Sequence, residues 1–136
     1  MDVTGDGILD LVQALCYNSS NLRGIYTNDG DYTDTINYPD VLTNITSATG
    51  EGIEVKYLTS PLYKNANNNL LNPNLAQVLN TVRHIIRDDG LGNLATTTYS
   101  YDGGEYFFES LTKRRFAGFA TTTVTDPDGN VTKTWA

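Results

Sequence analysis

Short turn sequences recur along this chain and limit the length of every element that can form between them. Gly, Asn and Asp cluster in these turns, and runs rich in Thr, Tyr and apolar residues lie between the clusters. β-branched and aromatic residues favour strands, whereas Asp-Gly and Asn-x-Gly sequences favour tight turns. The pattern therefore predicts a mainly β fold. The turn sequences are Asn28-Asp29-Gly30, Asp89-Gly90, Asp102-Gly103-Gly104 and Asp126-Pro127-Asp128-Gly129.

The runs between the turns are the candidate strands. An Asn-rich stretch at Lys64–Asn74 predicts a flexible connection between two of them. A break near Val41–Gly52 divides the chain into a short N-terminal piece, residues 1–45, and a larger piece, residues 46–136. The predicted strands are Ile8–Tyr17, Leu22–Thr27, Gly52–Leu58, Leu94–Tyr101, Glu105–Glu109, Phe116–Thr125 and Asn130–Trp135.

One further segment has the periodicity of a helix. Its apolar residues recur at spacings of three and four, and Asn72-Pro73 before them has the residues of a helix cap and a first-turn proline. On periodicity alone, this segment is predicted to be a helix. The apolar residues concerned are Leu75, Val78, Leu79, Val82, Ile85 and Ile86.

Length and charge argue against several classes of protein. The 136 residues have the length of one ordinary domain, and no apolar run approaches the roughly 20 residues of a membrane-spanning helix. The formal net charge of −7 argues against a nucleic-acid partner, because such binding depends on Lys and Arg that neutralise phosphates. The basic cluster Lys113-Arg114-Arg115 is short and is interpreted as a solvated strand edge or loop. Cys16 is the only cysteine, so it cannot form an internal disulfide.

The strongest chemical pattern lies at the start of the chain, in residues 2–10. Calcium prefers roughly six to eight oxygen ligands, and a tight loop with oxygen-bearing side chains at alternate positions brings such ligands to one point. Gly5 and Gly7 permit the sharp turn that this geometry needs. The alternative is a polar turn that only begins a strand. The expected calcium ligands are the side chains of Asp2, Thr4, Asp6 and Asp10 and the backbone carbonyl of Ile8.

This loop and the residues after it resemble one blade of the FG-GAP or VCBS repeat. The matching residues are Asp2–Val12 and Gly24–Asp31, in which an aspartate loop is followed by strands and an Asn-x-Gly turn. Thr4 departs from the Asp or Asn that is usual at the third loop position, which implies a weaker site. Because such repeats build β-propellers, residues 1–45 are predicted to form a partial propeller blade. The pattern begins directly after Met1, so we expect the chain to be a piece of a longer protein.

The remainder of the chain resembles the region that follows such a propeller in the B components of bacterial insecticidal toxin complexes and in related Rhs (YD-repeat) proteins. The matching stretches occur in the family's order and, with the blade, span nearly the whole chain. Residues 46–136 are therefore predicted to form an antiparallel β region at the start of an Rhs-like β-shell. The matching stretches are Gly52–Thr59, Asp88–Asn93, Thr96–Tyr101, Arg115–Phe119 and Thr125–Asn130.

The resemblance implies a role as well as a fold. In that family a propeller adjoins a hollow β-shell that encloses a toxic effector, and the propeller docks to the partner that delivers it. The resemblance thus implies a secreted, non-catalytic structural segment whose partners are other subunits or domains of a toxin complex. It also favours a strand at Asn80–Arg87 over the helix, and we adopt the strand. Open strand edges in such a segment predict self-association.

Two other functions follow from the residues alone. A hydrolase would have to be built on His84, the only histidine, but no nucleophile motif lies near it and a structural role is favoured. The carboxylate pairs Asp88-Asp89 and Asp126 with Asp128 lie in turns, where aspartate caps its own backbone. The second alternative is a calcium-stabilised adhesion or carbohydrate-binding β module, although cross-strand packing is the commoner role of its aromatic residues. Those residues are Tyr99, Tyr101, Tyr106, Phe107 and Phe108.

Overall fold

Two antiparallel sheets contain all the strands in the part of the chain that the structure describes. The computed structural model describes residues 11–14, 23–26, 41–75 and 77–136. The smaller sheet is the hairpin of β1 (Leu11–Ala14) and β2 (Arg23–Tyr26). Both strands lie inside strands that the sequence predicts in the N-terminal piece.

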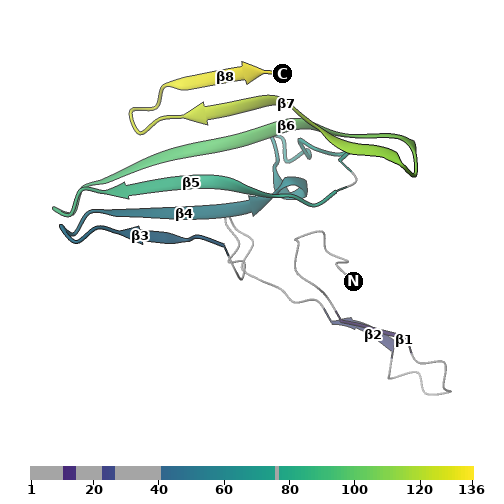
Figure 1. Ribbon diagram of the computed structural model, residues 1–136, viewed down its shortest axis with the longest axis horizontal. Coiled ribbons are helices and arrows are strands. Elements are labelled where there is room, and N and C mark those ends of the chain that lie inside the picture. The colour runs from purple at the N-terminus through teal and green to yellow at the C-terminus, as the bar shows by residue number, and fades with distance from the viewer. Residues whose placement is uncertain (1–10, 15–22, 27–40, 76) are drawn as a thin grey trace.

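The larger sheet is a six-stranded meander in which each strand pairs with the next one along the chain (Figure 1). Every pair is antiparallel, and β3 and β8 are the open edges. The described residues contain no α-helix and one short 3₁₀ turn at Ser60–Leu62, so the prediction of a mainly β fold is confirmed. The strands are β3 (Asn44–Thr46), β4 (Gly52–Thr59), β5 (Asn80–Asp88), β6 (Leu94–Ser110), β7 (Lys113–Thr125) and β8 (Val131–Trp135).

Strand β5 occupies the segment that has helical periodicity, so the helix prediction is wrong and the strand at Asn80–Arg87 is confirmed. The pairing with β4 explains the misleading pattern. Tyr57 lies opposite Val82, but Lys56 lies opposite His84, so Arg83 is an extra residue in a β-bulge. The bulge puts Val82 on the same face as Ile85, three residues later, because their partners Tyr57 and Val55 share one face of β4. A bulged strand with apolar residues on both faces thus imitates the spacing of a helix.

Strand β6 continues through Asp102-Gly103-Gly104, so the turn predicted there is wrong. The strands predicted at Leu94–Tyr101 and Glu105–Glu109 are one strand. Gly103 has a φ of 65° and bends β6 without ending it. The amides of Gly103 and Gly104 donate to the Leu71 carbonyl at 3.1 Å and to the Asn72 side chain at 2.8 Å. The chain reverses later, between Ser110 and Lys113.

Four five-residue turns share one geometry. In each, the backbone amide of the first residue donates to the carbonyl of the fifth, and the fourth residue has a positive φ, as at Gly92 (92°) and Asn68 (63°). The side-chain oxygen of the first residue accepts the amide of the third. Three of these turns join β3 to β4, β5 to β6 and β7 to β8, at the same end of the meander. The turns are Ser47–Glu51, Asn65–Asn69, Asp89–Asn93 and Asp126–Asn130.

The Asn-rich connection Lys64–Asn74 between β4 and β5 is mostly exposed, but one of its residues is buried and holds it to the sheet. Asn72 is only 4% exposed. Its amide nitrogen donates to the carbonyls of Ser60 (2.9 Å) and Tyr101 (3.0 Å), and its oxygen accepts the amide of Gly104 at 2.8 Å. The Asn72 side chain therefore joins the 3₁₀ turn to β6, instead of capping a helix.

The small buried core lies beside this connection. Tyr63 is 2% exposed, and its hydroxyl is 2.9 Å from the hydroxyl of Thr81. Its ring meets the ring of Tyr101 edge-on, with centroids 5.6 Å apart. The guanidinium of Arg83 lies over the Tyr63 ring at 5.5 Å and donates to the Tyr99 carbonyl at 2.9 Å. The bulged residue of β5 is thus anchored on the core.

Candidate functional site

The predicted calcium loop lies outside the described residues, and so does Cys16. This applies to Asp2, Thr4, Asp6, Ile8 and Asp10 alike. In the segments that the structure does describe, no group of three or more His, Cys, Asp or Glu residues is placed to hold a metal ion.

His84 lies in a cross-strand row on the larger sheet. It is opposite Lys56 of β4 and Thr98 of β6. Its Nδ1 is 3.0 Å from the Thr98 hydroxyl, which is a neutral partner. This arrangement fits the structural role that the sequence favours for His84.

The five aromatic residues proposed for sugar stacking occupy different environments. The ring of Tyr101 packs between the rings of Tyr63 and Phe119, whose centroids are 5.6 Å and 5.0 Å away. The pKa of the Tyr101 hydroxyl is raised, mainly because the side chain is partly buried. Phe107 and Phe108 are exposed, at 48% and 60%, near the far end of the β6–β7 hairpin. The half-buried Tyr101 ring is therefore not part of one exposed surface with Phe107 and Phe108.

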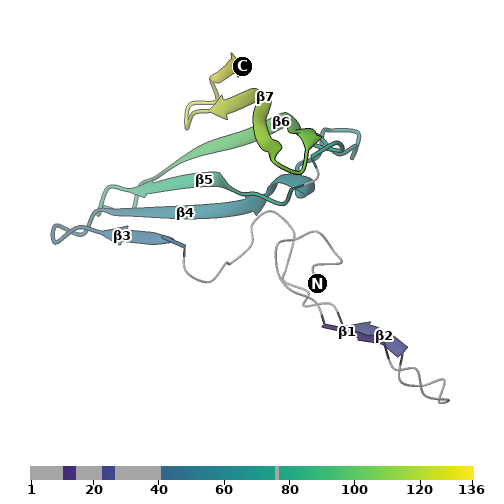
Figure 2. The same ribbon diagram turned by 45° about the vertical axis from the view of Figure 1, so that its right-hand side comes forward.

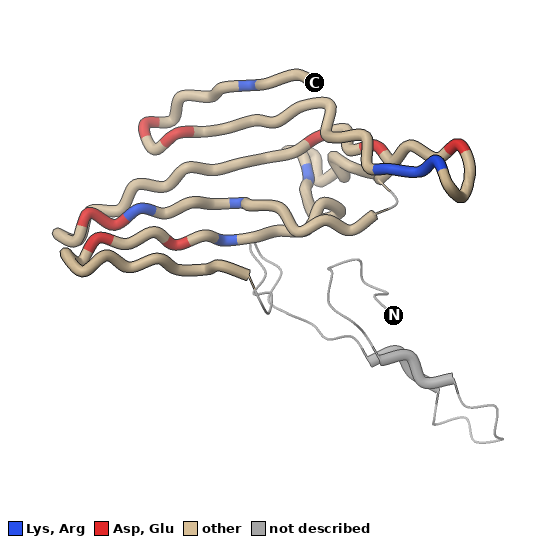
Figure 3. Tube along the Cα trace, viewed as in Figure 1, with Lys and Arg blue, Asp and Glu red and all other residues tan. Residues whose placement is uncertain are grey.

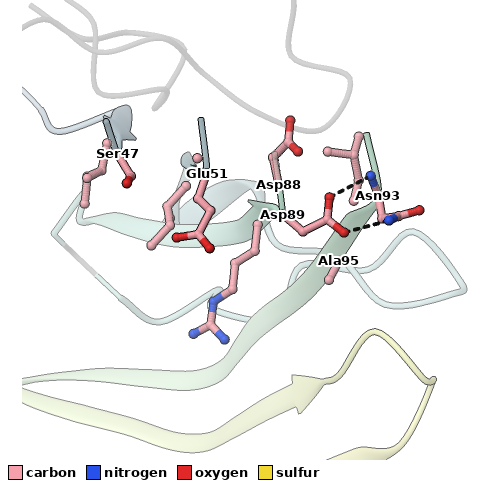
Figure 4. Close-up of a pocket in the computed structure, with 11 residues that line it drawn as sticks. Ser47, Glu51, Asp88, Asp89, Asn93 and Ala95 are labelled. Atoms are coloured by element: carbon pink, nitrogen blue, oxygen red, sulfur yellow. Dashed lines mark hydrogen bonds between the residues drawn. The ribbon is translucent and has the colours of Figure 1, made fainter. Parts of the chain in front are cut away.

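A groove lies at the end of the sheet where the turns of common geometry gather (Figure 4). Its volume is about 480 Å³. Its floor comes from three neighbouring strands, because Ile45 of β3 lies opposite Ile53 of β4, and Ile53 lies opposite Arg87 of β5. Leu94 and Ala95 of β6 complete the apolar lining, and Leu94 is 68% exposed. We call this surface the acidic groove because its charged lining is mostly anionic: Glu51, Asp88 and Asp89, with Arg87 as the one cation.

Two carboxylates of the groove, those of Asp88 and Asp89, accept hydrogen bonds from the turn between β5 and β6. Asp89 accepts the amides of Leu91 (2.8 Å) and Asn93 (3.1 Å), and it accepts the Asn93 side-chain amide at 2.6 Å, as Figure 4 shows. These hydrogen bonds stabilise the charged carboxylate and hold the pKa of Asp89 below its ordinary 3.8. The bond from the Asn93 side chain has the largest effect. Asp88 accepts the amide of Gly90 at 2.9 Å. Asp89 thus keeps its negative charge at neutral pH.

At the opposite end of the sheet, the β6–β7 hairpin carries the cations Lys113, Arg114 and Arg115 (Figure 3). Leu111 at its turn is 78% exposed. The guanidinium of Arg115 lies 6.0 Å from the Phe107 ring, and Lys113 pairs with Glu109 at 3.3 Å. We call this surface the basic tip and define it as Phe107, Phe108, Leu111, Lys113, Arg114 and Arg115. The solvated position that the sequence predicts for the basic cluster is confirmed.

Sequence reasoning identifies the turn at Asp89 and the basic cluster but misses the Ser47–Glu51 turn and the groove. The apolar floor of the groove forms only when Ile45 of β3 pairs with Ile53 of β4. The sequence predicts a break between the two pieces at β3, so it does not predict this pairing. The available signal was Ile45 between Asn44 and Thr46, a short alternation before Ser47-Ala48-Thr49-Gly50, which has the composition of a turn.

Comparison with known proteins shows a family match over the whole chain. The family model described as the insecticide toxin TcdB middle/N-terminal region matches residues 1–136. No curated protein and no solved structure matches the chain. No helix within the described residues is long and apolar enough to span a membrane.

Proposed function

Since the chain belongs to the family of the insecticide toxin TcdB middle/N-terminal region, we propose that it is a structural and interaction segment of a secreted bacterial toxin-complex protein. In this role the segment has no catalytic function. It contributes to an Rhs-type β-shell that encloses or delivers a toxic effector. Its partners are the other subunits or domains of the toxin complex.

The observation that supports this role is how little apolar surface the six-stranded sheet covers by itself. Among the described residues, the buried hydrophobic side chains are those of Leu58, Tyr63 and Leu75. A sheet that is stable alone normally packs one face against a second layer. The larger sheet therefore has the form of one layer in a bigger β assembly.

The register of the larger sheet separates an apolar face from a more polar one. Residues directly opposite each other in an antiparallel pair point to the same face. We define the apolar face as Ile45, Ile53, Val55, Ile85 and Ala95, which share their rows with Arg87 and Thr97. The apolar face is the side expected to pack against a neighbouring layer. The opposite face carries Asn44, Glu54, Lys56, Thr96 and Thr98, together with His84 and Ile86.

The parent toxin protein with its effector provides the test of the shell role. Val55→Asp places a charge on the apolar face, and Lys56→Asp changes the neighbouring residue on the opposite face. We expect Val55→Asp to make the effector sensitive to added protease, because a buried unpaired charge disrupts packing between layers. Lys56→Asp should leave the effector protected. The milder Val55→Thr should give intermediate sensitivity, and equal protection in all three variants would contradict the shell role.

In the same proposal, residues 1–45 form a partial FG-GAP/VCBS-like blade whose loop binds calcium through Asp2, Thr4, Asp6, Asp10 and the Ile8 carbonyl. The antiparallel pairing of β1 with β2 supports a blade, because propeller blades are antiparallel sheets. The expected dissociation constant is on the order of 10⁻⁴ to 10⁻³ M, as in other extracellular modules.

Thermal unfolding with calcium and with a chelator tests the calcium loop. A ligand that binds only the folded state raises the midpoint. We expect calcium to raise it in the original chain and to have no effect on an Asp6→Ala variant. Identical midpoints of the original chain under the two conditions would rule against the loop as a calcium site.

Self-association through the open edges β3 and β8 completes the proposed interaction role. Edge strands present unpaired backbone groups that pair readily with another strand. Strand β8 is the longer of the two edges, with five residues, and Val131 and Trp135 on it are 57% and 73% exposed.

A further inference from the structure

The basic tip combines cations with exposed apolar side chains. Phe108 and Leu111 are 60% and 78% exposed, and the tip has three cations against the single carboxylate of Glu109. It lies at the end of the β6–β7 hairpin, which extends past β5 and β8 in Figure 1 and whose curved end comes forward in Figure 2. Such a surface fits a partner that is apolar in the middle and negatively charged around it.

The acidic groove has these two properties. Its floor is formed by Ile45, Ile53, Leu94 and Ala95, and carboxylates from two turns border the floor. Its volume of about 480 Å³ lies within the range of roughly 300 to 1,000 Å³ of clefts that accept small ligands. Arg87, the one cation in the lining, can face an aromatic ring of an incoming tip, as Arg115 faces Phe107 in the tip itself.

The tip and the groove lie at opposite ends of the same sheet, so one molecule cannot join its own two surfaces (Figure 3). We propose that the basic tip of one copy of this chain docks into the acidic groove of a second copy. The contact is heterologous, because it joins two different surfaces and leaves one tip and one groove free for further copies. The groove floor shares Ile45, Ile53 and Ala95 with the apolar face, so this inference concerns the chain by itself, where no neighbouring layer covers that face. It does not depend on the open edges.

The proposed contact is small and partly electrostatic, which fixes its expected behaviour. A surface of a few side chains lies at the low end of specific interfaces, so the association should be weak. Its charges are exposed, so raising the salt concentration should weaken it. Pairing of β8 edges depends on backbone hydrogen bonds and apolar contacts, and salt should not weaken it in this way.

A charge swap tests the docking. Arg114→Glu changes the tip and Glu51→Lys changes the groove, and both residues are exposed. In sedimentation equilibrium of the full chain, we expect each variant alone to associate at least about tenfold more weakly than the original chain. An equimolar mixture of the two should recover most of the affinity, because the tip of Glu51→Lys then meets the groove of Arg114→Glu with their original charges.

Three results would overturn the proposal. The first is an original chain that stays monomeric at all concentrations, and the second is a mixture no stronger than the single variants. The third is unchanged association of the Phe108→Ser variant, which lacks one apolar side chain of the tip. Vesicles containing phosphatidylserine serve as the competing partner in a pelleting assay. Binding to them through Phe108 without any self-association would assign the tip to lipid instead and reject the groove.

Discussion

At the scale of single residues, Asn72 connects more of the larger sheet than any other side chain described above. It is 4% exposed and makes three hydrogen bonds, to the Ser60 and Tyr101 carbonyls and from the Gly104 amide. These bonds bridge segments that are 12, 29 and 32 residues apart in sequence. From its neighbours in sequence alone, Asn72 is predicted to cap a helix, because its actual hydrogen-bond partners are distant in the sequence.

Asn72→Ala should therefore destabilise the chain strongly. It leaves two buried carbonyls and one buried amide without their partner, at a cost of about 2 to 4 kcal/mol in the free energy of unfolding. Urea denaturation followed by circular dichroism measures this loss. The exposed Asn74→Ala is the matched control and should change the free energy by less than about 0.5 kcal/mol. Similar losses in both variants would show that the Asn72 bonds contribute little.

Two glycines of one turn allow the cost of backbone strain to be measured apart from the cost of a close contact with an added side chain. Gly90 and Gly92 have φ values of 75° and 92°, which disfavour any residue with a Cβ. A Cβ on Gly90 would also lie 3.0 Å from the carbonyl carbon of Gly50, whereas a Cβ on Gly92 would have nothing within 4 Å.

Gly92→Ala should cost about 1 kcal/mol of stability, and Gly90→Ala should cost clearly more. The extra loss arises because the turn must move away from Gly50 and Glu51. Thermal unfolding of both variants measures the difference. If Gly92→Ala proved the more damaging of the two, the close approach of the β3–β4 and β5–β6 turns would be in error.

At the scale of elements, the turns Asp89–Asn93 and Asp126–Asn130 make stability depend on pH. Each first-position carboxylate accepts two backbone amides and one Asn side chain. The Asn side-chain bond is the leading cause that lowers the pKa of both carboxyls below 3.8. The charged form is therefore favoured in the folded chain, and its contribution to stability is present above pH 3.8 and is lost as the pH falls through the lowered pKa.

The double variant Asp89→Asn/Asp126→Asn should flatten this dependence. Asparagine is compatible with the first turn position, because Asn65 accepts the Asn67 and Asn69 amides at 2.9 and 3.0 Å in the same geometry. We expect a smaller drop in the thermal midpoint below pH 4 for the variant than for the original chain. Parallel pH profiles for the two chains would mean that other groups control the acid sensitivity.

The sequence predicts the turns at Asp89 and Asp126 correctly and the one at Asp102 wrongly, and the hydrogen bonds explain the difference. The Asp126–Asn130 turn is completed inside five residues by the Asp126 side chain and backbone, so its signal is local. The Asp102-Gly103-Gly104 sequence has similar composition but does not form a turn. There the backbone amides of Gly103 and Gly104 donate hydrogen bonds to Leu71 and Asn72, which are more than 30 residues away in the chain.

At the scale of the whole molecule, the open edge β8 predicts association that differs from tip-to-groove docking. Val131, Lys133 and Trp135 alternate along β8 and share one face of it. The double variant Val131→Lys/Trp135→Lys removes the two large apolar side chains of that face and leaves three lysines on it. Edge pairing should weaken even where salt screens the repulsion, because pairing would have to remove water from the charged side chains. Sedimentation at high salt, where docking is weakened, measures the edge contribution. Unchanged association of the variant under those conditions would exclude β8 as the pairing edge.

The sequence by itself determined the β class, the two turns that begin at Asp89 and Asp126 and the resemblance to toxin-complex proteins, because each depends on residues that are close together in the chain. Only the tertiary structure decided that Val82 and Ile85 lie on a bulged strand, that β6 is continuous, and that Ile45 and Ile53 form the floor of a groove. These outcomes depend on which strand lies beside which and in what register. Neighbouring residues in sequence do not carry that information, because a pairing is chosen by the free energy of the whole sheet.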